Sequence, residues 1–116
     1  AVYSLSIYNN TTSTAGNVFI DGGARLYRST SSRRYKKDIV PLDAADRQRI
    51  LQLQPIAFRA IDTDKAHMGL VAEDVAVIEP RLVNDAADEV AYTHLTAGLL
   101  AVLQDLHARV VALEAR

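Results

Sequence analysis

Apolar and polar positions alternate with a period of two near the start of the chain. Large side chains occupy every second position from Tyr3 to Ile7, and a second apolar run covers residues 18–20. A Gly-Gly pair at 22–23 separates that run from residues 24–28. Such alternation, interrupted by glycines, predicts strand–turn–strand structure for residues 1–30.

This predicted β-segment is too short to close a core of its own. An isolated hairpin is marginally stable in water, so the strands need a partner. They either pack on the rest of the chain or form the end of a longer β-rich stalk shared between identical chains. We favour the stalk.

From residue 40 onward the pattern becomes helical. Asp43 is followed three residues later by Asp46, which is typical of a helix N-terminus, and Pro55 ends the helix that follows. The elements after it are short. We expect a strand at 56–61 and a polar turn at 62–65, and then a second helix at 73–78 that Pro80 ends.

The last segment, after a loop at 84–89, carries the strongest periodic signal. Apolar or small residues recur in alternating steps of four and three, as in the a and d positions of a coiled coil. These seam positions are Tyr92, Thr96, Leu99, Leu103, Leu106, Val110 and Leu113. The sequence therefore predicts a helix over residues 92–116.

The flanks of the seam change along this helix. A second apolar stripe of Leu95, Leu100 and Val102 widens the first half, whereas His107, Arg109 and Glu114 make the second half polar. We expect the first half to pack on a globular core and the second half to project as a coiled coil. The seam favours self-association, but leucine at d with mixed a residues does not decide between dimer and trimer.

Composition removes several classes of function. The 116 residues include no cysteine, which excludes disulfides, thiolate metal sites and cysteine nucleophiles. Three widely spaced histidines show no metal-ligand pattern, so we expect no metal and no cofactor. No apolar run approaches the roughly 18 residues of a membrane span, and we expect no membrane partner. A net charge of -1 leaves nucleic-acid binding to a local patch.

One such patch is the stretch SSRRYKKDI at residues 31–39. Four basic residues fall within residues 33–37, and Tyr35 is the one aromatic residue among them. A run of this kind is most often a solvated face. Contact with a polyanion and proton-transfer chemistry are the functional alternatives.

The chemical alternative pairs a serine with a lysine. Neighbouring positive charges favour the neutral amine that a general base requires, and Lys36 lies among such charges. Ser31 could then be the nucleophile of a Ser-Lys pair. Residues five apart do not meet on a regular helix or strand, so a turn or a neighbouring chain must bring these two together.

Four blocks in order resemble a known family. They are SSRRYKKDI at 31–39, LQPIAFR at 53–59, MGLVAEDV at 68–75 with Pro80 and Val83 after it, and the helix from Tyr92 to Leu113. Together they are similar to the intramolecular chaperone (peptidase S74) domain of phage endosialidases, tail spikes and tail fibres. That domain is also found in myelin regulatory factor.

The resemblance implies an α+β fold in three parts. Residues 1–30 are the end of a β-rich fibre or stalk, and residues 31–116 are the auto-processing chaperone, a small mixed α/β domain. Its long C-terminal helix, 92–116, forms a trimeric coiled coil. The partners implied are two further copies of the chain and the upstream fibre or spike domains, with no nucleic acid and no membrane.

The resemblance also implies a self-cleaving serine endopeptidase that acts once. Ser31 is the expected nucleophile, Lys36 its base and Thr30-Ser31 the cleaved bond. Arg34 is expected to orient the turn or to bind a carboxylate, for which Glu73 and Asp74 are candidates, and not to take part in the chemistry.

The expected location is the phage tail, as a fibre or spike precursor assembled in the host cytoplasm, from which the chaperone part is released. Ser32 stands where many members carry aspartate, which bears on the cleavage rate. A structural trimerisation cap that never cuts is the alternative function, and DNA binding through residues 33–37 is a third.

Overall fold

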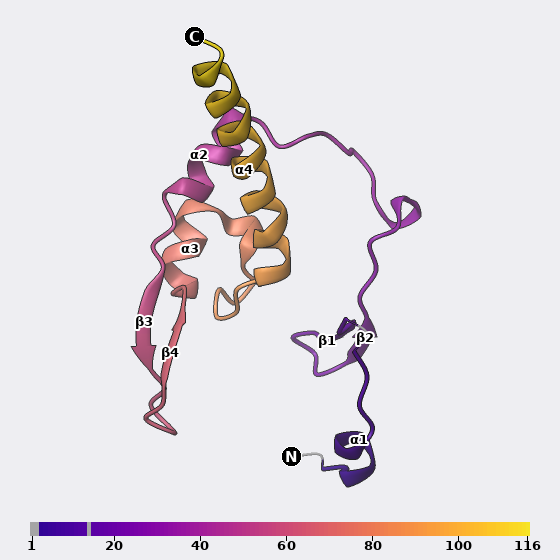
Figure 1. Cartoon of the computed structure of the whole chain (residues 1–116). Helices are drawn as coiled ribbons and strands as arrows, with labels where there is room; N and C mark the ends of the chain where they lie inside the picture. Colours follow the sequence, from indigo (N-terminus) through magenta and orange to yellow (C-terminus); the bar gives the residue numbers. More distant parts are fainter. Residues whose placement is uncertain (1–2, 14) are drawn as a thin grey trace. The chain divides into compact units, whose positions relative to one another are not determined.

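The computed structural model describes residues 3–13 and 15–116 (Figure 1). Residues 1, 2 and 14, which belong to the predicted N-terminal β-segment, lie outside the described residues. The chain divides into two compact units, Ala1–Ile39 and Val40–Arg116. We call these the N-terminal unit and the C-terminal unit, and describe each by itself.

The N-terminal unit begins with a helix, α1 (Leu5–Asn9), so the strand predicted there is wrong. The Ser4 hydroxyl accepts a hydrogen bond from the Ile7 N–H at 3.2 Å and caps the helix. Without a neighbouring strand to pair with, local hydrogen bonds and a serine cap satisfy this backbone better than an extended conformation does. The side chains that produced the alternation are exposed.

A two-stranded antiparallel hairpin follows, as the sequence predicts. Strands β1 (Val18–Ile20) and β2 (Leu26–Arg28) pair with Phe19 opposite Tyr27. In the turn, the Asp21 carboxylate accepts the N–H groups of Gly23 and Arg25, both at 2.9 Å. Every described side chain of the two strands is exposed, so this hairpin has no hydrophobic core of its own.

The C-terminal unit begins with α2 (Ala44–Leu51), whose capping box confirms the predicted helix start. The Asp43 carboxylate accepts the Asp46 N–H, and the Asp46 carboxylate accepts the Asp43 N–H, each at 2.9 Å. Each side chain thus satisfies a backbone donor that the first helical turn leaves open.

A second hairpin comes next. Strand β3 (Ile56–Arg59) confirms the predicted strand, and it pairs antiparallel with β4 (Ala66–Gly69), which the sequence did not reveal. Arg59 and Asp64 close its turn through two hydrogen bonds of 2.9 Å.

The predicted second helix is confirmed as α3 (Ala72–Ile78), with Pro80 starting the short 3-10 helix η2 (Pro80–Leu82). Among the described residues, Val75 and Leu82 are the buried hydrophobic side chains, 2% and 5% exposed. The mixed α/β domain is therefore built on a small core.

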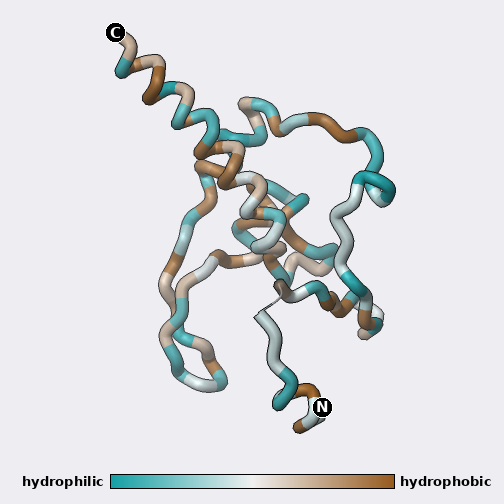
Figure 2. The backbone as a smooth tube through the Cα atoms, turned by 45° about the vertical axis from the view of Figure 1, so that its right-hand side comes forward, coloured by the Kyte–Doolittle hydropathy of each residue, from teal (hydrophilic) through white to brown (hydrophobic). Residues whose placement is uncertain are grey.

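The last helix, α4 (Tyr92–Glu114), also confirms its prediction. It lies beside α2, and Gly98 is buried against Ile50 (Figure 1). The larger seam side chains from Tyr92 to Leu113 remain between 42% and 60% exposed. Figure 2 shows apolar and polar residues interspersed along α4 to the C-terminus.

By length and composition alone, α4 could cross a membrane. The expectation that no segment is apolar enough for this is therefore wrong on that criterion. Length and composition are weak evidence for a membrane span, and the heptad spacing gives the same apolar residues another use.

Candidate functional site

A single turn brings Ser31 and Lys36 together. The 3-10 helix η1 (Arg33–Tyr35) lies between them, held by hydrogen bonds from the Tyr35 N–H to the Ser32 carbonyl and from the Lys36 N–H to the Arg33 carbonyl, at 3.1 and 3.0 Å. The Lys36 Nζ then reaches the Ser31 Oγ at 2.8 Å. The sequence left a turn or a neighbouring chain as alternatives, and here a turn within one chain makes the contact.

The surroundings of this pair are open and basic. Thr30, Ser31 and Lys36 are all exposed, as are the basic neighbours in residues 33–37. The Arg34 guanidinium lies over the Tyr35 ring, 5.0 Å from its centre. Within the described part of the chain, no salt bridge involves these basic residues.

The backbone leaves this turn through an unusual conformation. Asp38 has a positive φ of 53°, in the left-handed region that non-glycine residues seldom occupy. Asp and Asn tolerate this region better than other residues, because their short polar side chains can hydrogen-bond locally. Asp38 thus follows the turn in a conformation that its short side chain tolerates.

The expected carboxylate partners of Arg34 lie in the other unit. Glu73 and Asp74 occupy the first turn of α3 and are exposed. Arg34 belongs to the N-terminal unit, so its pairing with either carboxylate stays a prediction.

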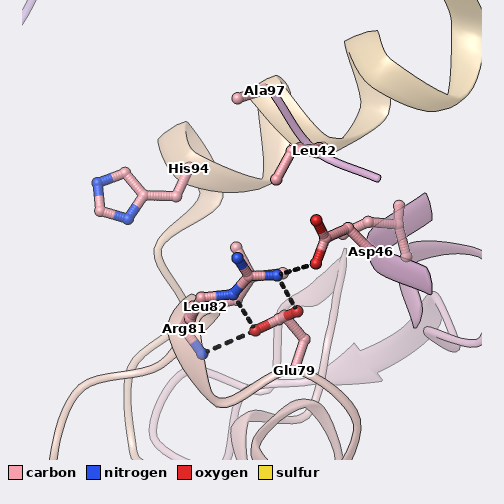
Figure 3. Close-up of a pocket in the computed structure, with 9 residues that line it drawn as sticks. Leu42, Asp46, Glu79, Arg81, Leu82, His94 and Ala97 are labelled. Carbon is pink, nitrogen blue, oxygen red and sulfur yellow. Dashed lines mark hydrogen bonds and ion pairs between the residues drawn. The ribbon is translucent and has the colours of Figure 1, made fainter. Parts of the chain in front are cut away.

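A second polar cluster was not found from the sequence. Asp46, Arg49, Glu79 and Arg81 form a network that joins α2 to η2. Figure 3 shows Arg81 between the carboxylates of Glu79 and Asp46, with distances of 2.7 and 2.8 Å to Glu79 and 2.7 Å to Asp46. Arg49 donates to Glu79 at 3.0 Å and also contacts Asp46.

This network explains how a carboxylate can be buried in so small a core. Glu79 is 4% exposed. Hydrogen bonds from Arg81 and then from Arg49 lower the pKa of Glu79 to about 2, against the opposing effect of burial. The pKa of Asp46 is also lowered, first by the Asp43 N–H and then by Arg81. Both carboxylates are therefore ionised and paired at neutral pH.

A cavity of about 220 Å³ lies beside the network (Figure 3). Its walls include Leu42, Ile50 and Leu82. The acidic and basic side chains at its edge are paired with one another, which leaves them little capacity to bind a charged ligand. The cluster therefore has a structural role. Among residues 3–13 and 15–116, no group of three or more acidic or histidine side chains is arranged to hold a metal ion.

Comparison with known proteins agrees with the motifs. Residues 31–84 match the family model described as the chaperone of endosialidase, peptidase S74. The match covers just under half of the chain and supports an intramolecular chaperone domain in this segment. No curated protein matches the chain.

The matched segment of this chaperone family begins at Ser31 and extends through α2, the second hairpin, α3 and η2. The Ser31–Lys36 turn is thus the first part of the family domain, and α4 lies beyond the match. The family description supports a chaperone role for this domain, and the family name is that of a peptidase.

Proposed function

We propose that this chain ends in an intramolecular chaperone that trimerises, assists the folding of an upstream phage tail fibre or spike, and then cuts itself free between Thr30 and Ser31. The observation that carries the proposal is the 2.8 Å contact between Lys36 Nζ and Ser31 Oγ at the first residues of the family segment. A hydroxyl and an amine at this distance can exchange a proton directly.

The chemistry begins with a neutral Lys36 amine. Lys36 Nζ takes the proton of Ser31 Oγ, reversing the direction of the hydrogen bond, and the oxygen attacks the carbonyl carbon of Thr30. The C–N bond between Thr30 and Ser31 breaks, and Lys36 returns the proton to the Ser31 nitrogen. An ester now joins Thr30 to Ser31 Oγ. Water hydrolyses it to a Thr30 carboxylate and a free Ser31.

Assembly is the step that we expect to activate this pair. In the single chain, Ser31 and Lys36 are exposed, and water competes for both groups and screens their neighbours. Covering the turn with other copies of the chain removes that water and strengthens every polar interaction within it. The exposed seam of α4 supplies a surface for such assembly.

The N-terminal unit fits the role of a fibre end. Its described apolar side chains are exposed, among them Leu5 at 72% and Val18 at 71%. A short hairpin with this surface gains stability only by packing against other strands. We propose that the chain upstream and two further copies provide them.

The test compares two neighbouring serines. Ser31→Ala removes the proposed nucleophile, whereas Ser32→Ala removes a hydroxyl that makes no capping hydrogen bond in the turn. Mass spectrometry of fresh protein should show fragments 1–30 and 31–116 for wild type, the same two fragments formed at an altered rate for Ser32→Ala, and an intact chain for Ser31→Ala. Hydroxylamine should speed fragment release from wild type, because it attacks the ester. Identical fragments from Ser31→Ala would refute self-cleavage.

A structural trimerisation cap that never cuts is the second candidate. One observation favours it: within the described residues, Ser31 Oγ is the hydrogen-bond partner of Lys36 Nζ, and no third side chain orients the amine. Wild-type protein that stays intact after assembly into trimers would support the cap and exclude the peptidase.

A further inference from the structure

Helix α4 presents different faces to its own domain and to solvent. Gly98 faces α2 so closely that an added Cβ would lie 2.7 Å from Ile50 Cδ1. Asp105, two turns later, contacts Arg47 of α2 at 3.8 Å. The seam residues lie roughly 100° (position d) to 160° (position a) around the helix from this face and are exposed. The domain therefore covers one side of α4 and leaves the seam for another chain.

The seam spacing fixes the heptad positions along α4. Thr96, Leu103 and Val110 take position a, and Leu99, Leu106 and Leu113 take position d. The flanking e positions are then Leu100, His107 and Glu114, and the g positions are Leu95, Val102 and Arg109. In a parallel coiled coil, each g residue lies beside the following e residue of the neighbouring helix.

We propose that Arg109 pairs with Glu114 of a neighbouring copy and that this ion pair sets the parallel, in-register alignment of the α4 helices. The proposal rests on the assembly part of the proposed function. In this register Leu95 also meets Leu100 and Val102 meets His107 of the neighbour. Apolar contacts thus flank the first half of the seam and an ion pair flanks the second.

Other alignments lose this complementarity. An antiparallel pairing sets g positions against g positions, so Arg109 would face Leu95, Val102 or another Arg109. A parallel shift by one heptad places Arg109 beside His107 or leaves it without an opposing e residue. Charge therefore selects one alignment that the apolar seam alone does not specify.

Both side chains are available for the pairing. Arg109 is 70% exposed, and its Nε contacts Asp105 of the same helix at 3.0 Å, which leaves the other guanidinium nitrogens free to donate. In the described chain Glu114 takes part in no salt bridge. A single exposed ion pair adds little affinity, so we assign this one to alignment, where a like-charge contact penalises the wrong arrangement.

The test reverses one charge in the full chain, with Ser31→Ala present so that cleavage cannot alter the mass. Glu114→Arg places arginine opposite Arg109 of each neighbour, although arginine at the end of an isolated helix is favourable. In a trimer, three ion pairs become like-charge contacts. Each should lower the association constant about fivefold, so together they should lower it roughly 100-fold. Glu114→Gln, the uncharged control, should lower it roughly tenfold.

A charge swap isolates the contact between chains. Arg109→Glu places a carboxylate beside Glu114 of each neighbouring copy. It also places a carboxylate beside Asp105 of the same helix. Arg109→Glu with Glu114→Arg keeps the Asp105 conflict and restores the pair between copies, so it should assemble more tightly than Arg109→Glu alone. Light scattering over a concentration series measures each constant, and 1 M salt should reduce the differences.

The outcomes separate the two proposals. A trimer that Glu114→Arg leaves unchanged, or a swap that rescues nothing, overturns the alignment role and leaves trimerisation standing. A parent chain that stays monomeric at every concentration overturns both.

Discussion

The two units differ in how far apart in the sequence the side chains are whose contacts stabilise them. In the N-terminal unit, the described side-chain hydrogen bonds join residues at most five apart, as Lys36 and Ser31 are. In the C-terminal unit, Arg49 and Glu79 lie 30 residues apart and Arg81 and Asp46 lie 35 apart. Long-range contacts make folding cooperative, whereas local contacts form and break separately. The candidate reactive pair thus lies in the unit that is less constrained.

The two units also differ in net charge. Residues 1–39 contain six basic and two acidic residues, a net charge of +4, and residues 40–116 contain seven and twelve, a net charge of -5. The basic turn lies after the proposed cleavage point, so it stays with the released chaperone. The comparison predicts that changes in the first unit alter cleavage and changes in the second alter stability.

The largest expected effect is on cleavage. Lys36→Arg keeps the positive charge but replaces the amine with a guanidinium that stays protonated. Loss of a general base slows a reaction by about 10²-fold or more, so fragments should become nearly undetectable in a timed gel assay. Lys37→Arg, one position along, is the matched control and should cut at the wild-type rate. Normal cutting by Lys36→Arg would remove Lys36 from the mechanism.

The next effect is on the stability of the C-terminal unit. Glu79→Gln removes the carboxylate that Arg49 and Arg81 share and should lower the free energy of unfolding by about 3 kcal/mol. Chemical denaturation followed by circular dichroism measures it. Glu89→Gln, an exposed change of the same type, should cost less than about 0.5 kcal/mol. Equal losses in both variants would show that the network contributes no stability.

Acid should act on the same carboxylate. The pKa of Glu79 is lowered from 4.5 to about 2 in the folded unit, so its contribution is fully present above pH 4.5 and is lost as the pH falls towards 2. The free energy of unfolding should drop by about 2 kcal/mol between pH 6 and pH 3, measured by chemical denaturation at each pH. Glu79→Gln should show a flatter pH profile, and an unchanged profile would contradict the assignment.

The smallest effect concerns two alanines with positive φ. Ala24 lies in the first hairpin turn at 62° and Ala87 in the loop before α4 at 54°. Glycine adopts this conformation without strain, so Ala87→Gly should stabilise the C-terminal unit by about 1 kcal/mol. Ala24→Gly should leave the main thermal transition unchanged. An equal rise in the temperature of the main thermal transition for Ala24→Gly and Ala87→Gly would mean that the two units unfold together.

The sequence predicted most accurately the helices whose own residues mark an end or form a repeat. Asp43, Pro55 and Pro80 mark helix ends by local chemistry, and the seam marks α4 by repetition. The N-terminal strand prediction failed at Leu5–Asn9 because alternation requires a pairing strand, whereas the Ser4 cap requires none. Strand β4 was missed because its residues lack a strand pattern and are extended by pairing with β3.

For the candidate site, the sequence singled out Ser31 and Lys36 and left a turn or a neighbouring chain to bring them together; their catalytic role stays a prediction. It could not show that η1 makes that turn within one chain, because three residues of 3-10 helix have no distinctive pattern. The Glu79 network also escaped prediction. Its members come from segments about thirty residues apart, and only folding reveals that they converge.

The position of β2 determines what a cut after Thr30 leaves behind. The strand ends at Arg28, and the Ser29 N–H still donates to the Asn17 carbonyl at 2.6 Å. The upstream product of the proposed cut would therefore end in a paired hairpin followed by the single residue Thr30. If the proposed cut occurs, the upstream product should therefore have one uniform C-terminal residue, Thr30.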